Sequence, residues 1–516
     1  MAVVKTITNG RAKILAGAII ALYLAVLIHL SSAVPLQDWF NHFARAVVMA
    51  DLIFRHGTHF GGVFQYRFLP MPYALGDLAL SALVAVVGAS IAAKLWLVII
   101  FLSLPAALAF YLRVFKAPEL SQILALILAA YLSTDFFFAL GFVAFRLGIA
   151  MTLTCLALAQ LLRQRWSPAL YAAYCLAMAL GYLMHLSAFV FVTAAICASA
   201  SLRMWLRTSS LRREGILLIP VACVAVWNVG VSHFDTAPID RPQGHYLWGT
   251  AYTKLRGLVM PFWRYERHWD WCLLLVLVLC LGCLVYRPLR ARVRLRPEVL
   301  EMMVLGVTFL GMYVVMPFNT ERVWLVDARM IPMVAVFVIC ACLLYRPESA
   351  AEFRSYALPL VLAAALAVGN LAYLTRHLQK DHEWMSAYRT VVAEIPLRAK
   401  VLPVYTRPAG ELVAPLLHAA SYVVIDRNGD IPYLFSGNIG HPMRYFRYIK
   451  RSYSPSETWY QDSDLGPEVW RQIACTYDYL LVMKPFDRKR IRVAATIIAE
   501  SSSVALFVVE KQACTA

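Results

Sequence analysis

Charged residues are scarce in this sequence. Asp, Glu, Lys and Arg make up 15% of its 516 residues, whereas 61% of the residues are hydrophobic. Soluble globular domains carry roughly 25% charged residues, and the mean hydropathy of this chain is +0.64. This composition excludes a soluble enzyme and predicts an integral membrane protein with several spans.

Signature motifs of several enzyme classes are also missing. No GxGxxG, Walker, HExxH or GxSxG element occurs in a suitable context, which disfavours soluble-nucleotide enzymes, metalloproteases and serine hydrolases. The 11 cysteines show no Cys/His metal spacing. Cys475 and Cys514 can form a disulfide if the C-terminal region lies outside the cytoplasm.

Positive charge exceeds negative charge, with a formal net charge of +18. Most basic residues lie in short clusters between apolar runs, as membrane topology predicts, so nucleic acid is not an expected partner. Lys5, Arg11 and Lys13 precede the first apolar run. We therefore expect a cytoplasmic N-terminus and a multi-pass protein with every later basic cluster on the same side.

The apolar runs between these basic clusters form pairs, in which the first run crosses the membrane outward and the second crosses back. The predicted spans cover 14–34, 95–112, 120–138, 142–162, 168–184, 186–204, 214–232, 271–286, 298–316, 329–345 and 355–375. A further run, 73–90, is expected to stay on or partly in the outer leaflet, because a full crossing would invert the remainder of the chain. That inverted topology is the alternative.

The fold class predicted from these patterns is mostly α, a polytopic membrane protein of about 11 transmembrane helices. Residues 1–375 form the transmembrane domain, with outer-face juxtamembrane helices in 35–92, and 376–516 form a small extracytoplasmic α/β domain. Within that domain the expected strands are 401–405, 421–426, 479–482 and 504–509, and the expected helices are 383–394, 411–420 and 486–500.

A polar stretch follows the first span. In Pro35–Arg45, the residues Asp38, His42 and Arg45 recur at i, i+4 and i+7 and share one helical face. One interpretation is an interfacial helix with solvated charges. The other is a functional site, since an acid near bilayer depth is costly unless it is paired or used. Asp38 and His42 could bind Mg²⁺ or Mn²⁺, but two ligands make only a weak case and no cofactor is certain.

Two further groups of polar residues are expected on the same side. Asp135 and Arg146 face each other across the turn between two predicted spans, either as an internal ion pair or as part of a site. His185 lies between two apolar runs, where a histidine is more often a packing residue.

A dense polar stretch, Pro317–Arg329, contains Arg322, Asp327 and Arg329. These three side chains could simply fix one another. Arginine forks also suit phosphate oxygens, so the stretch is a candidate binding site.

The order of these features resembles the GT-C superfamily of membrane glycosyltransferases, which use polyprenyl-linked sugar donors. An acid (Asp38) follows span one, juxtamembrane helices come next, a second acid (Asp135) occupies the next outer loop, and an extracytoplasmic domain ends the chain. The stretch Gln37–Arg45 also looks like a first-loop motif of related bacterial membrane proteins. The chain departs from the pattern in lacking a DxD or Asp-Glu pair within the predicted transmembrane domain, 1–375, and in lacking a Lys-Pro-Pro element and a WWD-type motif.

The resemblance implies an inverting glycosyl transfer at the outer surface of a bacterial inner membrane, with a periplasmic C-terminal domain. Asp38 would be the general base and Asp135 would orient the acceptor or the base. Arg45, Arg322 and Arg329 would neutralise the donor phosphate. The remaining substrate-binding candidates are His42, Arg146, His185 and Asp327.

The partners implied by the resemblance are a polyprenyl-phosphate sugar donor, the lipid bilayer, and an envelope lipid, glycan or protein acceptor. Two other functions fit the same residues. One is a transporter or flippase for a lipid-linked sugar, which predicts a polar pathway through the bundle. The other is a non-catalytic subunit of an envelope polysaccharide assembly system, which predicts that Asp38 tolerates substitution by alanine.

Overall fold

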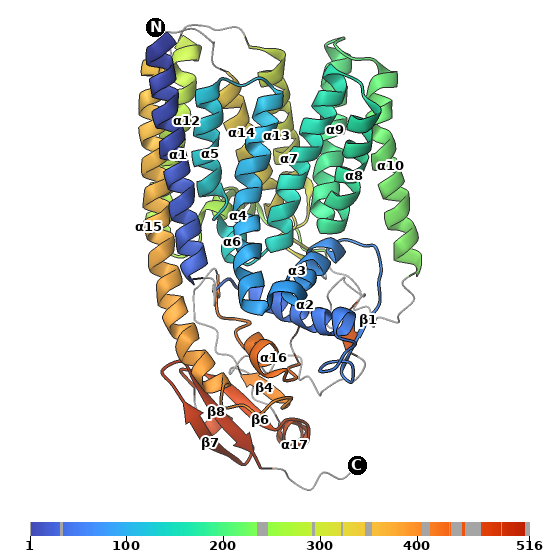
Figure 1. The fold of residues 1–516 in the computed structure, drawn as a ribbon, viewed down its shortest axis with the longest axis vertical. Helices are drawn as coiled ribbons and strands as arrows, with labels where there is room; N and C mark the ends of the chain where they lie inside the picture. The colour runs from blue at the N-terminus through green and yellow to red at the C-terminus, as the bar shows by residue number, and fades with distance from the viewer. Residues whose placement is uncertain are drawn as a thin grey trace.

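The protein is a long helical bundle with a small sheet at one end (Figure 1). The structure is a computed structural model that describes residues 2–30, 35–234, 246–290, 295–320, 323–345, 353–404, 413–432, 434, 446–448, 466–486 and 488–510. The predicted fold class, a mostly α polytopic membrane protein with a small C-terminal sheet, is confirmed.

Within the part of the chain that the structure describes, eight helices contain segments long and apolar enough to cross a membrane. They are α1 (Ala2–Leu30), α4 (Ala89–Val114), α7 (Val143–Gln164), α9 (Leu186–Trp205), α10 (Leu211–Phe234), α12 (Arg267–Arg290), α13 (Pro297–Val315) and α15 (Phe353–Val392). Three shorter apolar helices, α5 (Glu119–Leu132), α8 (Pro168–Met184) and α14 (Ile331–Leu344), lie among them in the bundle (Figure 1). The number of eleven crossings, which includes these three, stays a prediction.

The predicted span 120–138 is interrupted. The helix α5 ends at Leu132, and a separate short helix α6 (Phe136–Ala139) begins after Asp135. The Asp135 carboxylate accepts a hydrogen bond from the Phe138 backbone N–H at 3.0 Å and so caps α6. The polar side chain of Asp135 therefore begins a new helix within the segment that hydropathy predicts as one continuous span.

The run 73–90 forms a short helix near the end of the bundle where α1 terminates (Figure 1). This helix, α3 (Ala74–Val87), has 14 residues and is about 21 Å long, which is less than the roughly 30 Å of a bilayer core. Gly88, at φ +79°, turns the chain from α3 directly into α4. The helix α2 (Trp39–Phe54) packs against α3 and lies across the same end of the bundle.

Charges at the opposite end of the bundle tie four helices together. Arg163 at the end of α7 bonds Glu214 at the start of α10, with Nη2 and Oε2 2.6 Å apart. Arg203 of α9 bonds Glu301 of α13 at 2.5 Å. Basic residues that lie between apolar runs in the sequence thus neutralise Glu214 and Glu301, two acids that are buried in the bundle.

Short elements connect the later helices. Between α10 and α12 lie α11 (Ala251–Val259) and η2 (Met260–Phe262). Between α13 and α14 lie the hairpin strands β2 (Asn319–Thr320) and β3 (Val323–Trp324), followed by η3 (Ala328–Met330).

The helix α15 carries the chain from the bundle to the C-terminal sheet. The boundary expected at 375/376 falls inside this helix, so the last apolar span and the expected helix 383–394 are one element. The sheet has the order β4-β6-β8-β7, with β4 and β6 parallel and the other pairs antiparallel. Its strands are β4 (Val401–Val404), β6 (Tyr479–Met483), β7 (Ala495–Glu500) and β8 (Val504–Val509), and α17 (Pro467–Thr476) packs on it through Trp470 and Ile473.

Three expectations for the C-terminal region are wrong. Of the expected helix 411–420, residues 411–412 lie outside the described residues and 415–420 form turns, not a helix. Residues 421–426 form a helix, α16 (Ser421–Arg427), because its β-branched side chains Val423 and Val424 are buried in packing against α2 and α15. The stretch expected as the helix 486–500 instead contains β7, whose alternating burial suits an edge strand pairing with β8. The strand β1 (Phe64–Tyr66) pairs with β5 (Phe446–Tyr448), a contact between the segment that follows α2 and the C-terminal region.

Cys475 of α17 is disulfide-bonded. Cys514, its expected partner, lies outside the described residues.

Substituting Gly141 by alanine will destabilise the fold. Gly141 has φ +74°, and a Cβ there would lie 2.5 Å from the Trp39 backbone nitrogen and 2.9 Å from that of Asp38. Left-handed strain together with overlap against backbone costs on the order of 3 kcal/mol. We expect a lower midpoint of thermal unfolding for purified Gly141→Ala.

Gly311→Ala is the matched control, because a Cβ at Gly311 in α13 would meet nothing within 4 Å. It should leave the midpoint unchanged or raise it slightly, because alanine in place of a helical glycine raises the free energy of unfolding by up to about 1 kcal/mol. Equal midpoints for the two variants would contradict the close approach at Gly141.

Candidate functional site

Asp38 precedes α2 at the end of the bundle where α1 terminates. Its backbone N–H donates to the Leu140 carbonyl at 2.9 Å, and the Gln37 N–H donates to the Ala139 carbonyl at 3.2 Å. Gly141 lies directly against this backbone. The turn between α6 and α7 therefore fixes Asp38 relative to the bundle.

The Asp38 carboxylate is not used as a helix cap, although Asp38 occupies the N-cap position of α2. An aspartate there ordinarily accepts hydrogen bonds from the first backbone N–H groups of the helix. Instead Oδ1 lies 3.5 Å from Nε2 of His418 and 3.4 Å from Nε2 of Gln37. The side chain is 17% exposed, so the carboxylate retains access to a bound molecule.

His42 and Arg45 are on the face expected for α2, but they contact each other and α3. Arg45 Nη2 lies 2.9 Å from Nδ1 of His42 and 2.8 Å from Oδ2 of Asp77. The Arg45 side chain is 1% exposed. This cluster holds α2 against α3. Spacing along the chain does not predict the pairing of Arg45 with Asp77.

Asp135 and Arg146 form the buried ion pair that was one of the two interpretations. Arg146 Nη1 lies 2.7 Å from Oδ2 of Asp135, and its Nη2 donates to the Leu132 carbonyl at 2.7 Å. The cavity beside the pair measures about 10 Å³, which is too small for a sugar or a lipid headgroup. In this structure the pair connects the ends of α5, α6 and α7.

His185 and Arg329 form a third cluster. Nε2 of His185 lies 3.2 Å from Nη1 of Arg329, and Nδ1 accepts from the Ser187 backbone N–H at 3.0 Å. The Arg329 guanidinium lies over the rings of Phe142 and Phe145, at 4.9 and 5.6 Å from their centroids. Arg329 therefore approaches the same α6–α7 turn that holds Asp38.

Asp327 pairs with Lys254 of α11 rather than with a neighbouring arginine. Lys254 Nζ donates to Asp327 Oδ2 at 2.6 Å and to the carbonyls of Tyr313 and Met316 at 2.8 and 2.7 Å. The expectation that Arg322, Asp327 and Arg329 fix one another is thus wrong for Asp327. Arg322 lies outside the described residues.

The sequence did not predict that His418 and Gln37 are the residues nearest the Asp38 carboxylate. His418 comes from the C-terminal region, 380 residues further along the chain, and Gln37 was noted only as part of the first-loop stretch. A single histidine in the apolar run Pro415–Ala420 was the available signal for His418. Spacing along the chain could not connect it to Asp38.

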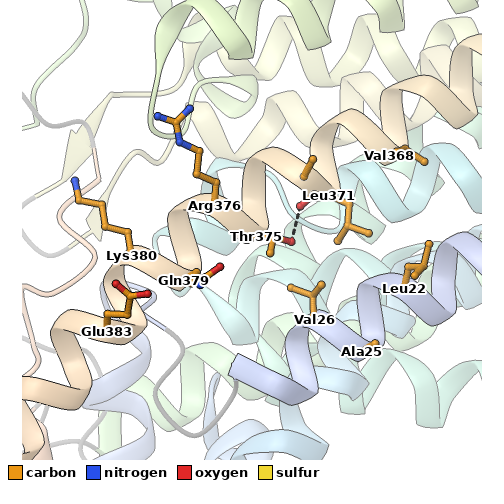
Figure 2. A pocket seen from close by; sticks show the side chains of 11 residues that line it. Leu22, Ala25, Val26, Val368, Leu371, Thr375, Arg376, Gln379, Lys380 and Glu383 are labelled. Carbon is orange, nitrogen blue, oxygen red and sulfur yellow. Dashed lines mark hydrogen bonds between the residues drawn. The ribbon is translucent and has the colours of Figure 1, made fainter.

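Two larger hollows lie near this end of the bundle. A groove of about 730 Å³ runs between α1 and α15, with apolar walls that include Leu22, Val26 and Leu371. Figure 2 shows Leu371 and Thr375 on the side of α15 towards α1, whereas Arg376 and Lys380 extend away from α1. A polar hollow of about 490 Å³ lies between the end of α15 and α16.

The polar hollow is bordered by Arg389, which forms an ion pair with Asp426 at 2.9 Å. The Arg389 guanidinium also lies 4.7 Å from the centre of the Tyr422 ring. Burial raises the pKa of the Tyr422 phenol, so this ring remains protonated and neutral at physiological pH. Among the described residues, no group of three or more His, Cys, Asp and Glu side chains is arranged to hold a metal ion.

The architecture is similar to that of one protein whose structure has been solved in two states. The chain is similar to ArnT from Cupriavidus metallidurans in the apo state, with a TM-score of 0.54 and 11% identity over 95% of this chain and 97% of that one. This chain has the GT-C fold. The same ArnT bound to undecaprenyl phosphate aligns with a TM-score of 0.55 and 10% identity, over 97% of this chain and 98% of that one.

No protein-family model matches the chain, and no curated protein matches it. The GT-C fold is thus recognised here through the arrangement of helices along almost the whole chain.

Removing the acid of the α2–α3 cluster will lower stability strongly. Asp77→Ala leaves the buried Arg45 guanidinium without its carboxylate partner, and breaking a buried pair in this way costs about 3–5 kcal/mol. Thermal unfolding of the purified protein measures the loss.

Asp426→Ala is the control, since it removes the acid of a pair whose side chains are 36% and 26% exposed. Such a pair is worth about 0–1 kcal/mol. If both variants unfolded at the same temperature, the Arg45–Asp77 pair would not be holding α2 against α3.

Proposed function

We propose that this chain is a membrane glycosyltransferase that moves a sugar from a polyprenyl-phosphate donor to an envelope lipid, glycan or protein on the extracytoplasmic side. The observation that carries the proposal is the Asp38 carboxylate. It occupies an N-cap position without capping, and it is only partly buried at the end of a GT-C bundle.

In the proposed reaction Asp38 is the general base. An acceptor hydroxyl attacks the anomeric carbon of the donor sugar while its proton passes to the carboxylate. The bond from that carbon to the phosphate oxygen breaks, and its electron pair leaves with the polyprenyl phosphate. Attack opposite the leaving group inverts the anomeric configuration.

A cation near the leaving phosphate would stabilise the charge that grows there. Of the arginines expected to do this, Arg45 is buried in its pair with Asp77. Arg329 is better placed, because it stacks on Phe142, the residue after the Gly141 that abuts Asp38. The proposal therefore assigns the phosphate to Arg329 ahead of Arg45.

The proposed substrate is a lipid, and the groove between α1 and α15 supports this choice. Its apolar walls belong to the half of α1 that leads into the Asp38 loop (Figure 2). The solved structure of ArnT with undecaprenyl phosphate indicates that the GT-C fold accommodates such a carrier.

Asp135 and Arg146 take a supporting part in this proposal. Asp135 caps α6 and Arg146 lies in the first turn of α7. The turn between these two helices holds the Asp38 backbone, so the pair acts on the base through the protein.

The proposal predicts that Asp38→Asn loses glycosyl transfer. Purified wild-type protein would be offered a panel of polyprenyl-phosphate donors with radiolabelled sugars and a membrane extract as acceptor. The amide cannot take the proton, so the rate should fall by about 10²- to 10⁴-fold while the unfolding temperature stays near that of wild type.

The matched control is Asp426→Asn, an acid-to-amide change at an ion pair distant in sequence from the first loop, which should keep its activity. Equal transfer by wild type and Asp38→Asn would remove Asp38 from the chemistry. Movement of an intact labelled lipid across liposomes, with no sugar transferred, would instead favour a flippase.

A further inference from the structure

A segment of the C-terminal region lies along the first-loop stretch on both sides of Asp38. The Ala414 backbone N–H donates to Oε1 of Gln37 at 2.9 Å. Further along, the Ser421 hydroxyl donates to Oδ1 of Asn41 at 3.0 Å, and both residues are buried. Residues 414–421 are therefore held at each end against 37–41.

Aromatic packing strengthens the same contact. Tyr422 of α16 meets Phe40 of α2 edge to face, with ring centres 5.6 Å apart. Phe40 is fully buried and Tyr422 nearly so. This interface is thus a packed contact between α2 and α16 as well as a set of hydrogen bonds.

His418 lies in the middle of this docked segment. Its side chain is 6% exposed, and Nε2 is 3.5 Å from Oδ1 of Asp38. The Gln37 amide approaches the same oxygen at 3.4 Å. Both contacts fall on Oδ1, and within the described part of the chain Oδ2 accepts no hydrogen bond.

We propose that His418 is the positioning residue for Asp38, supplied by the C-terminal region to complete the site. In this proposal Nε2 carries the proton and, 3.5 Å from Oδ1, restrains the plane of the carboxylate, so that Oδ2 is presented to the acceptor hydroxyl. This inference rests on the proposed function, in which Asp38 is the general base. The hydroxyl proton moves to Oδ2, and His418 keeps its own proton throughout.

The consequence is that the C-terminal region belongs to the reaction site. The helix α15 joins the bundle to the sheet, and the 413–422 segment returns from the sheet to Asp38. Without such a contact, rotation about the Asp38 side-chain bonds would allow orientations in which neither carboxylate oxygen faces the acceptor. A misplacement of about 1 Å can lower the rate by 10²-fold.

The test compares three variants in transfer assays with a donor that wild type uses. His418→Ala should lower kcat by about 10²-fold with little change in KM. His418→Gln places an amide N–H near the position of Nε2 and should recover most of that loss. In the Asp38→Asn background, His418→Ala should cause no further loss, because it acts through the carboxylate.

Ser421→Ala is the matched control within the same interface. It removes the bond to Asn41 and leaves the Asp38 contact in place. It should lower the unfolding temperature slightly and keep kcat. If His418 were only a docking residue, His418→Ala and Ser421→Ala would behave alike, and the inference would be overturned.

The outcomes separate this inference from the proposed function. Wild-type kcat in His418→Ala, with Asp38→Asn inactive, would overturn the positioning role and leave Asp38 as the base. An active Asp38→Asn would overturn the proposed function itself.

A measurement without substrate tests the contact directly. Unfolding temperatures of wild type, Asp38→Asn, His418→Ala and the double variant form a double-mutant cycle. Non-additive shifts are expected if the two side chains interact, and additive shifts would overturn the inference even if no donor is transferred.

Discussion

The cost of burying charge in an apolar bundle governs the arrangement of this protein. Removing a charged side chain from water costs several kcal/mol unless a partner of opposite charge accompanies it. Many of the buried acids and cations accordingly occur in pairs. They include Arg45 with Asp77, Asp135 with Arg146, Arg163 with Glu214, Lys254 with Asp327 and Arg264 with Asp270. The first four pairs each join two different helical elements and so restrict which of these can be neighbours, whereas Arg264 and Asp270 are joined locally at the start of α12.

Asp38 differs from these acids in a way that bears on function. Its carboxylate has no arginine or lysine partner among the described residues, it is not used as a cap, and it is partly exposed. Its neighbours, His418 and Gln37, are weaker and directional partners. An acid that is oriented but not neutralised by a fixed cation suits proton transfer better than structural pairing.

The difference between an acid enclosed in an ion pair and a partly exposed acid also changes which of the predicted site residues are the better candidates. Asp135, which occupies the position of a second acid in the first half of the bundle, is enclosed with Arg146 beside a cavity of about 10 Å³. Arg329 approaches the α6–α7 turn through the rings of Phe142 and Phe145. Asp38 and Arg329 thus both contact the turn between α6 and α7.

Sequence alone determined the membrane class and the apolar runs and marked the stretch around Asp38 as a candidate site, because hydropathy and the cost of polar groups in lipid are local properties. It could not determine partners, since Asp77, His418 and Lys254 reach theirs through folding and not through spacing. The valine-rich segment at Ser421–Arg427 illustrates the same limit, because packing against α2 overrode its preference for a strand. Only the tertiary structure decided that a histidine 380 residues from Asp38 would stand beside it, because that contact depends on how α15, the C-terminal sheet and α16 pack together.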